Sequence, residues 1–235
     1  MGFHQNIIFM IEIIGTAAFA ASGAMTAIRK ELDLFGIIML GTITAVGGGI
    51  IRDIVIGRIP PNTFLHPVYI TVAMITAIFL FLLFYFKPEL DGSKHIKISE
   101  KVLNILDAVG LGAFTVIGID AGIEAGYEKY YFLLIFLGVT TGIGGGILRD
   151  IMAGEIPYVL KKQIYACASI AGAGLYTLLL QFSQSDYTML ISAGAIIFIR
   201  MLASRFDWNL PVVKKTNTTA QNEDSSAETD EKNSF

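Results

Sequence analysis

The chain has 235 residues, of which 54% are hydrophobic and only 16% are charged, and its formal net charge is −3. Soluble domains are usually about a quarter charged, so this composition excludes an ordinary soluble domain and predicts a protein that resides in a lipid bilayer. The single cysteine, Cys167, excludes an intrachain disulfide, and no nucleic-acid partner is expected.

Apolar segments long enough to cross a bilayer recur along the chain. In chain order they cover residues 6–28, 34–57, 66–86, 101–120, 131–153, 163–182 and 187–205. About 20 apolar residues in a helix span the hydrocarbon core. Buried helices of a large soluble protein are the alternative, but the segments have too little polar sequence between them. We therefore predict an all-α integral membrane protein with seven transmembrane helices, followed by a disordered polar tail at 214–235.

Lysine and arginine are distributed unevenly between the two sets of alternating loops. One set holds Arg29, Lys30, Lys87, Lys94, Lys97, Lys101, Arg149, Lys161, Lys162, Arg200, Arg205, Lys214 and Lys215. The opposite set holds only Arg52, Arg58 and Lys129. The positive-inside rule places the richer set in the cytoplasm. We expect a multi-pass protein of the inner (plasma) membrane, with the N-terminus outside and the C-terminus cytoplasmic.

The sequence contains an internal duplication. Residues 41–60 (GTITAVGGGIIRDIVIGRIP) and 138–157 (GVTTGIGGGILRDIMAGEIP) are identical at 12 of 20 positions. The similarity extends upstream, where 11–23 pairs with 106–118. We predict a first three-helix unit at 1–90, a second at 101–182 and a seventh helix at 187–210 outside the repeat. Because three is odd, the second unit enters the membrane from the opposite side, and such inverted repeats are typical of transport proteins.

A glycine triplet lies inside the second and the fifth predicted helices. The glycines are Gly47, Gly48, Gly49, Gly144, Gly145 and Gly146. Each costs about 1 kcal/mol of helix propensity relative to alanine, so both helices should kink, unwind or pack very tightly there. Unwound backbone in a bilayer lines a cavity or is buried in protein, and its freed carbonyls can coordinate a cation. Close packing through small residues is the alternative.

Hydroxyl groups lie within two turns of the glycines. They belong to Thr42, Thr44, Thr140 and Thr141. Because the triplets occur twice in inverted positions, we favour an ion pathway here, with transient K⁺ near the glycines and no fixed metal site. The three histidines have no partner at metal-ligand spacing, and we expect no cofactor.

Ionisable side chains inside or near the apolar segments are candidates for function. They are Glu12, Arg52 and Asp53 in the first unit, and Asp107, Arg149 and Asp150 in the second. Four acids against two bases place a net negative set at each end of a path, which attracts cations. For the arginines we favour a structural role, holding a helix end through a carboxylate; the alternative is that they obstruct the path in one state. No catalytic set is recognisable, so we do not expect an enzyme.

The paired GGGxxRD segments, the three-plus-three-plus-one plan and the length resemble the prokaryotic branch of the trimeric intracellular cation channel (TRIC) family. The same sequences are also labelled as glycine transporters. The resemblance implies a homotrimer with one hourglass-shaped, potassium-permeable pore in each subunit, shaped by glycine-containing bends that match 47–49 and 144–146. Two alternatives are a secondary transporter of a small solute such as glycine, and a membrane scaffold whose glycines serve only packing.

Overall fold

The computed structural model describes residues 3–86, 93–161, 164–182, 186–206 and 208, and every regular element in this part is an α-helix. The helices are α1 (Phe3–Arg29), α2 (Leu34–Val55), α3 (Asn62–Leu65), α4 (Val68–Phe86), α5 (Ser93–Glu124), α6 (Tyr131–Met152), α7 (Tyr158–Lys161), α8 (Ile164–Leu179) and α9 (Asp186–Arg205). The predicted tail at 214–235 lies outside the described residues.

Six of the described helices are long and apolar enough to cross a membrane, which confirms the all-α membrane class. They correspond to six of the seven predicted segments. The remaining segment, predicted at 163–182, is the 16-residue helix α8. At 1.5 Å per residue it spans about 24 Å, less than the hydrocarbon core. After Leu179 the backbone N–H groups of Gln181 and Phe182 bond to carbonyls three residues back, in turns and no longer in an α-helix.

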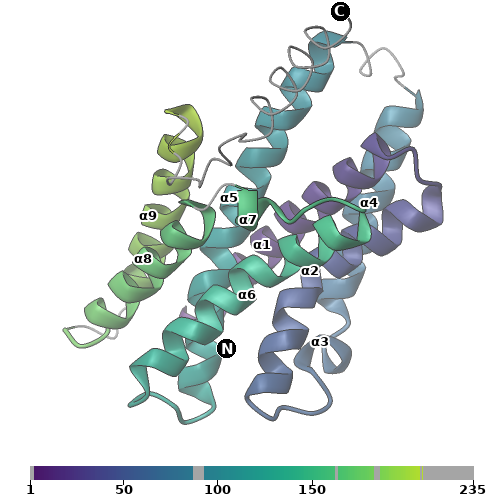
Figure 1. The fold of residues 1–235 in the computed structure, drawn as a ribbon. Coiled ribbons are helices and arrows are strands. Elements are labelled where there is room, and N and C mark those ends of the chain that lie inside the picture. The colour runs from purple at the N-terminus through teal and green to yellow at the C-terminus, as the bar shows by residue number, and fades with distance from the viewer. Residues whose placement is uncertain (1–2, 87–92, 162–163, 183–185, 207, 209–235) are drawn as a thin grey trace, which may run out of the picture.

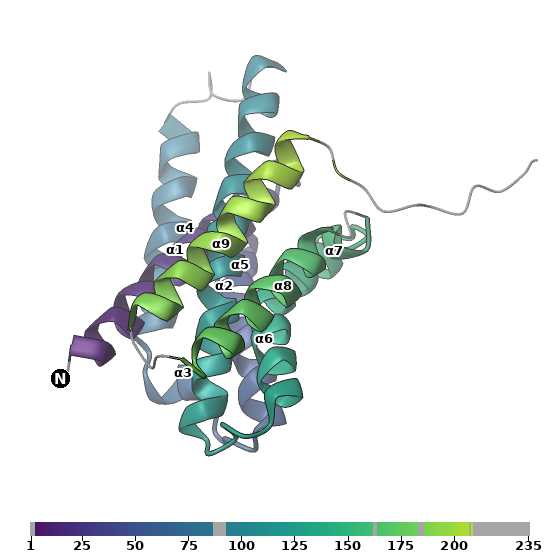
Figure 2. The ribbon, with the colours of Figure 1, turned by 90° about the vertical axis from the view of Figure 1, so that its left-hand side faces the viewer.

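The two units make corresponding contacts. Helix α1 packs against α2 and α4, and its counterpart α5 packs against α6 and α8. The units meet where α1 contacts α5 and α2 contacts α6, and the short helices α3 and α7 follow α2 and α6 in the same way. Helix α9, outside the repeat, packs against α5 and α8, as Figure 1 and Figure 2 show. The fold is therefore two three-helix units and one added helix.

The contact between α1 and α5 shows the repeat at the level of side chains. Phe19 and Phe114 occupy equivalent positions, and their ring centroids lie 5.3 Å apart. A Cβ on Gly110 would lie 2.0 Å from the Phe19 ring, and one on Gly15 would lie 3.4 Å from the Phe114 ring. Each ring thus packs against a glycine of the opposite helix, and the glycines let the two helices approach closely.

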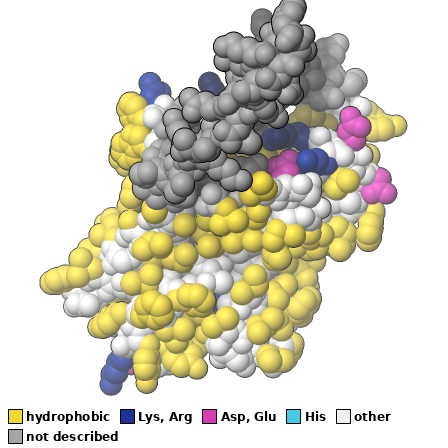
Figure 3. All heavy atoms as spheres, viewed as in Figure 1, with side chains coloured by type: hydrophobic (Ala, Val, Ile, Leu, Met, Phe, Trp, Pro, Cys, Tyr) yellow, Lys and Arg dark blue, Asp and Glu magenta, His cyan; other side chains and the backbone are white. Residues whose placement is uncertain are grey.

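The outer surface is what a bilayer requires. Figure 3 shows hydrophobic side chains over the middle of the molecule and charged side chains towards its two ends. Two ion pairs join loops that the predicted topology places on the same side: Lys30 with Glu155 at 2.8 Å, and Arg58 with Glu124 at 3.8 Å. The protein is a multi-pass membrane protein. Below, the end with α7 and Lys30 is called the inner end, and the end with α3 and Arg58 the outer end.

Candidate functional site

Helices α2 and α6 cross at their glycine triplets. A Cβ on Gly48 would lie 2.2 Å from the carbonyl oxygen of Thr141, and one on Gly145 would lie 2.1 Å from that of Thr44. Any larger residue would push the two backbones apart. Both helices run through the glycines without a break. Of the three expected outcomes, the structure has tight packing and no unwinding, so these carbonyls stay within regular helix and are not freed for a cation in this conformation.

The four candidate threonines differ in their surroundings. Thr44 and Thr141 are buried, and their hydroxyls donate to the carbonyls of Leu40 and Leu137, each at 2.6 Å. These two hydroxyls are therefore committed to their own helices. Thr140 is half-buried. The hydroxyl of Thr42 is buried and makes no hydrogen bond within the described part of the chain, so it is free to accept a new partner.

Four charged and polar side chains meet at the inner end. This inner cluster consists of Ser22, Asp107, Arg149 and Asp150. Arg149 donates from Nη1 to Asp107 at 2.6 Å and to the hydroxyl of Ser22, and from Nε to Asp150 at 2.8 Å. The second oxygen of Asp150 accepts from the backbone N–H of Tyr158 at 2.6 Å. One buried guanidinium thus ties α1, α5 and α6 together and holds the start of α7.

The equivalent residues at the outer end are connected differently. This outer cluster consists of Glu12, Arg52, Asp53 and Tyr69. Arg52 pairs with Asp53 at 2.8 Å, and Asp53 accepts from the backbone N–H of Asn62 at 2.8 Å, which repeats the inner arrangement. Glu12, the counterpart of Asp107, instead accepts a hydrogen bond from the Tyr69 hydroxyl. The outer arginine therefore has one carboxylate partner where the inner arginine has two.

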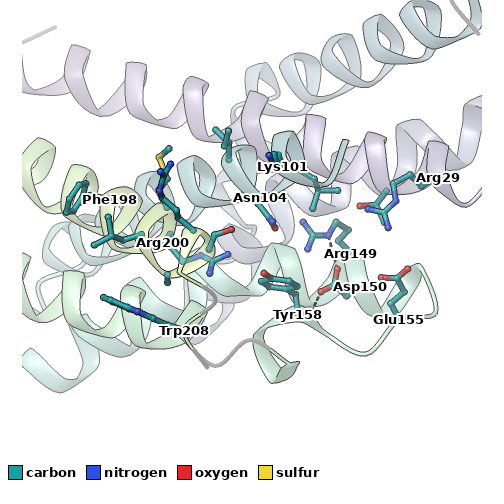
Figure 4. Close-up of a pocket in the computed structure, with 18 of the residues that line it drawn as sticks. Arg29, Lys101, Asn104, Arg149, Asp150, Glu155, Tyr158, Phe198, Arg200 and Trp208 are labelled. Atoms are coloured by element: carbon teal, nitrogen blue, oxygen red, sulfur yellow. Dashed lines mark hydrogen bonds and ion pairs between the residues drawn. The ribbon is translucent and has the colours of Figure 1, made fainter. Parts of the chain in front are cut away.

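A cavity adjoins each cluster. The outer cavity holds about 30 Å³ and is lined by side chains that include Glu12, Thr16, Arg52 and Tyr69. This is room for one or two water molecules. The inner cavity is far larger, about 1080 Å³, and Arg149 and Asp150 face it. Figure 4 shows Arg149 bonded to Asp150 at the wall of the inner cavity.

Several residues in and beside these clusters were not predicted from the sequence. Tyr69 and Tyr165 are equivalent, and the pair becomes visible when the repeat is extended past 60 and 157 with an offset of 96. The Tyr165 hydroxyl lies 3.3 Å, and Asp107 3.9 Å, from the position of a Cβ on Gly146. Ser22 had no signal in the sequence, because its partner Arg149 is 127 residues away.

Comparison with known proteins places these features in a family. The model of a family described as "Glycine transporter" matches residues 9–85 and 104–181, which include both clusters. A UPF0126 membrane protein of Vibrio cholerae is 36% identical over 212 residues, covering 90% of this chain and 84% of the relative. The UPF0126 inner membrane protein YadS of Escherichia coli is 35% identical over 207 residues, covering 87% and 95%.

Solved structures agree with this. A crystal structure of the TRIC trimeric intracellular cation channel orthologue from Rhodobacter sphaeroides superposes with a TM-score of 0.77 at 32% identity, over 87% of this chain and 100% of that one. A structure described under conductance through TRIC cation channels superposes with a TM-score of 0.75 at 31% identity, over 88% and 97%. The chain therefore belongs to the glycine transporter family of membrane proteins, and its fold is that of the TRIC channels.

Proposed function

We propose that this protein is a monovalent cation channel, permeable to potassium, with a pore inside each subunit along the crossing of α2 and α6. The observation that carries the proposal is the pair of inverted clusters, each with two carboxylates and one arginine and each beside a cavity. Each cluster has a formal charge of −1 if its groups are ionised, which favours cations at both ends of a path. The solved relatives of the same fold are described as cation channels.

The conformation at hand corresponds to a closed path. Gly48 and Gly145 bring the two backbones into contact and line neither cavity. Conduction then requires α2 and α6 to move apart, and each glycine permits a wider range of helix positions than a bulky residue would. Thr42, with its free buried hydroxyl on α2, is the side chain we propose to face a passing ion first.

The descriptions of the same relatives support a proposal for the assembly and the location. Because the solved structures are described as trimeric, we propose that the chain forms a homotrimer with three separate pores. One relative is described as an inner membrane protein, and we propose the same membrane here, with the N-terminus outside. We propose no enzymatic role.

Recording from purified protein in planar bilayers tests the channel. We expect unitary current steps whose reversal potential follows a potassium gradient. Replacing Glu12 with Gln should lower the unitary potassium conductance by roughly twofold, because it removes a charge beside the outer cavity. Glu31→Gln, at an exposed position between α1 and α2, is the matched control and should leave the conductance unchanged.

A secondary transporter of a small solute such as glycine is the alternative, and the description of the matching family model favours it. Inverted repeats also occur in carriers that alternate between two states. Uptake of labelled glycine into proteoliposomes separates the two. Saturable uptake without unitary current steps would contradict the channel, and steps without saturable uptake would contradict the carrier.

A further inference from the structure

A buried, positively charged side chain lines the inner cavity and has no role in the proposed ion path. Arg200, on α9, is only 3% exposed. Its guanidinium carbon lies 4.6 Å from the ring centre of Tyr165 and 5.5 Å from that of Tyr158. Among the described residues the Arg200 guanidinium has no carboxylate partner and no hydrogen-bond partner. Its Nε is buried and makes no hydrogen bond. An arginine cannot discharge by losing its proton, so the charge is present and only partly compensated by the two rings.

Arg200 faces the cavity together with other unpaired cations. Arg29, Lys101 and Arg205 line the same cavity, are exposed, and have no carboxylate partner within the described part of the chain. Figure 4 shows Arg29, Lys101 and Arg200 coming from α1, α5 and α9 to one cavity.

The acids in the cavity wall do not balance these charges. Asp150 forms an ion pair with Arg149, and Arg149 forms a second ion pair with Asp107. Glu155 is paired with Lys30. Arg29, Lys101, Arg200 and Arg205 therefore have no paired carboxylate in the described structure, and the single net negative charge of the inner cluster offsets only part of their charge.

We propose that the inner cavity is a binding site for a phosphoryl-bearing anion, with Arg200 as its central contact. Guanidinium groups bind phosphate through two parallel hydrogen bonds, and several cations around one cavity suit a doubly charged group. The volume of about 1080 Å³ exceeds what free phosphate needs, and Ile105, Phe198 and Met201 add apolar walls. The ligand is therefore a phosphoryl group on a larger body, either a soluble phosphorylated molecule or the headgroup of a lipid.

The central contact of this site lies outside the duplicated motifs, although Arg149 and Asp150 of the second motif line the same cavity. Arg200 belongs to the helix outside the repeat, and the matched family regions end at residue 181. A bound anion would cancel positive charge beside the inner cluster and so would couple ligand binding to the ion path proposed above. The binding measurement itself does not depend on that path.

The chain has a built-in reporter for this site, because its one tryptophan, Trp208, lines the cavity. The full-length protein in non-ionic detergent is titrated with inorganic phosphate at constant ionic strength while Trp208 fluorescence is followed. We expect a saturable change. Arg200→Gln should raise the dissociation constant for phosphate about tenfold. Arg200→Lys keeps the charge but cannot make two parallel hydrogen bonds, so its dissociation constant should lie between those of the wild type and Arg200→Gln.

Two further variants guard against misfolding of the Arg200 variants. Arg29→Gln and Arg205→Gln change exposed residues of the same cavity and should weaken phosphate binding by about threefold each. Arg58→Gln is the matched control at the outer end and should leave binding unchanged. Absence of a saturable change, or equal dissociation constants for the wild type and all four cavity variants, would overturn the proposal.

Nanodiscs distinguish the two sources of the phosphoryl group. One set contains only phosphatidylcholine, and the other contains equal parts of phosphatidylcholine and phosphatidylglycerol. If a lipid headgroup occupies the site, the anionic lipid should weaken phosphate binding to the wild type but not to Arg200→Gln. Equal binding in both lipid mixtures, still dependent on Arg200, supports a soluble phosphorylated ligand.

Discussion

Arg52 and Arg149 follow the same glycine triplet and precede the same aspartate, yet their surroundings differ. The neighbouring Asp53 or Asp150 is a partner in both cases. Only Arg149 also reaches Asp107, because Glu12, the outer counterpart, is bonded to Tyr69. A sequence comparison pairs Glu12 with Asp107 as equivalent acids and cannot show that one of them has another hydrogen-bond donor.

This difference predicts unequal effects on stability. Asp107→Asn should lower the free energy of unfolding by about 3 kcal/mol, because it leaves a buried guanidinium with one carboxylate fewer. Glu12→Gln, at the equivalent outer position, should cost about 1 kcal/mol, since it alters a hydrogen bond from Tyr69 and no direct ion pair. Denaturant unfolding in detergent micelles measures both, and equal losses would contradict the structural role of Arg149.

At the scale of the helix, the glycine triplets act as a packing surface. In this conformation they let α2 and α6 touch through backbone atoms, and they do not unwind either helix. A leucine at Gly48 or Gly145 would unpack the crossing, so a loss of activity in such a variant would not show that the glycines line a path. Smaller replacements and a matched glycine elsewhere are needed to measure the packing role.

Alanine at either crossing position should be destabilising. The added Cβ of Gly48→Ala or Gly145→Ala would meet a backbone carbonyl, which cannot rotate away, and should lower the unfolding free energy by about 2 kcal/mol. Gly194→Ala, on α9, is the control because its Cβ would meet nothing within 4 Å. It should be neutral or stabilise the helix by up to about 1 kcal/mol. Similar melting temperatures for all three variants would refute the close crossing.

For the whole molecule, the ion pairs between loops support helices that cross the membrane in alternating directions. They do not determine which end of the protein faces the cytoplasm. Lys30 and Glu155 meet at one end, and Arg58 and Glu124 at the other. Both ends carry such pairs, so geometry alone is nearly symmetric. The excess of lysine and arginine at the inner end is what predicts that this end is cytoplasmic.

Labelling of introduced cysteines tests that direction. In a Cys167→Ser background, Lys129→Cys lies between α5 and α6 at the outer end, and Glu31→Cys lies between α1 and α2 at the inner end. A membrane-impermeant maleimide applied to intact cells whose inner membrane is accessible should label position 129 and not position 31. Permeabilised cells, in which both should react, provide the control. The reverse pattern would show that the protein is inserted with its N-terminus inside.

The number of chains in the assembly can be measured directly. Native mass spectrometry of detergent-solubilised protein should give a particle with three copies of the chain, and limited chemical cross-linking should stop at the trimer. A monodisperse monomer that still produces unitary potassium currents would separate the pore from the assembly and contradict the proposed homotrimer.

Hydropathy, the duplication and the Arg-Asp spacing were legible in the sequence because they depend on short runs of neighbouring residues. They determined the membrane class, most helix positions and the inverted plan. The tertiary structure decided that the glycine helices stay unbroken, that Thr44 and Thr141 bond to their own helices, and that Arg149 joins Ser22 and Asp107. It also decided that four unpaired cations surround one cavity. These outcomes depend on distances between segments far apart in the chain, which only the packing of the helices sets.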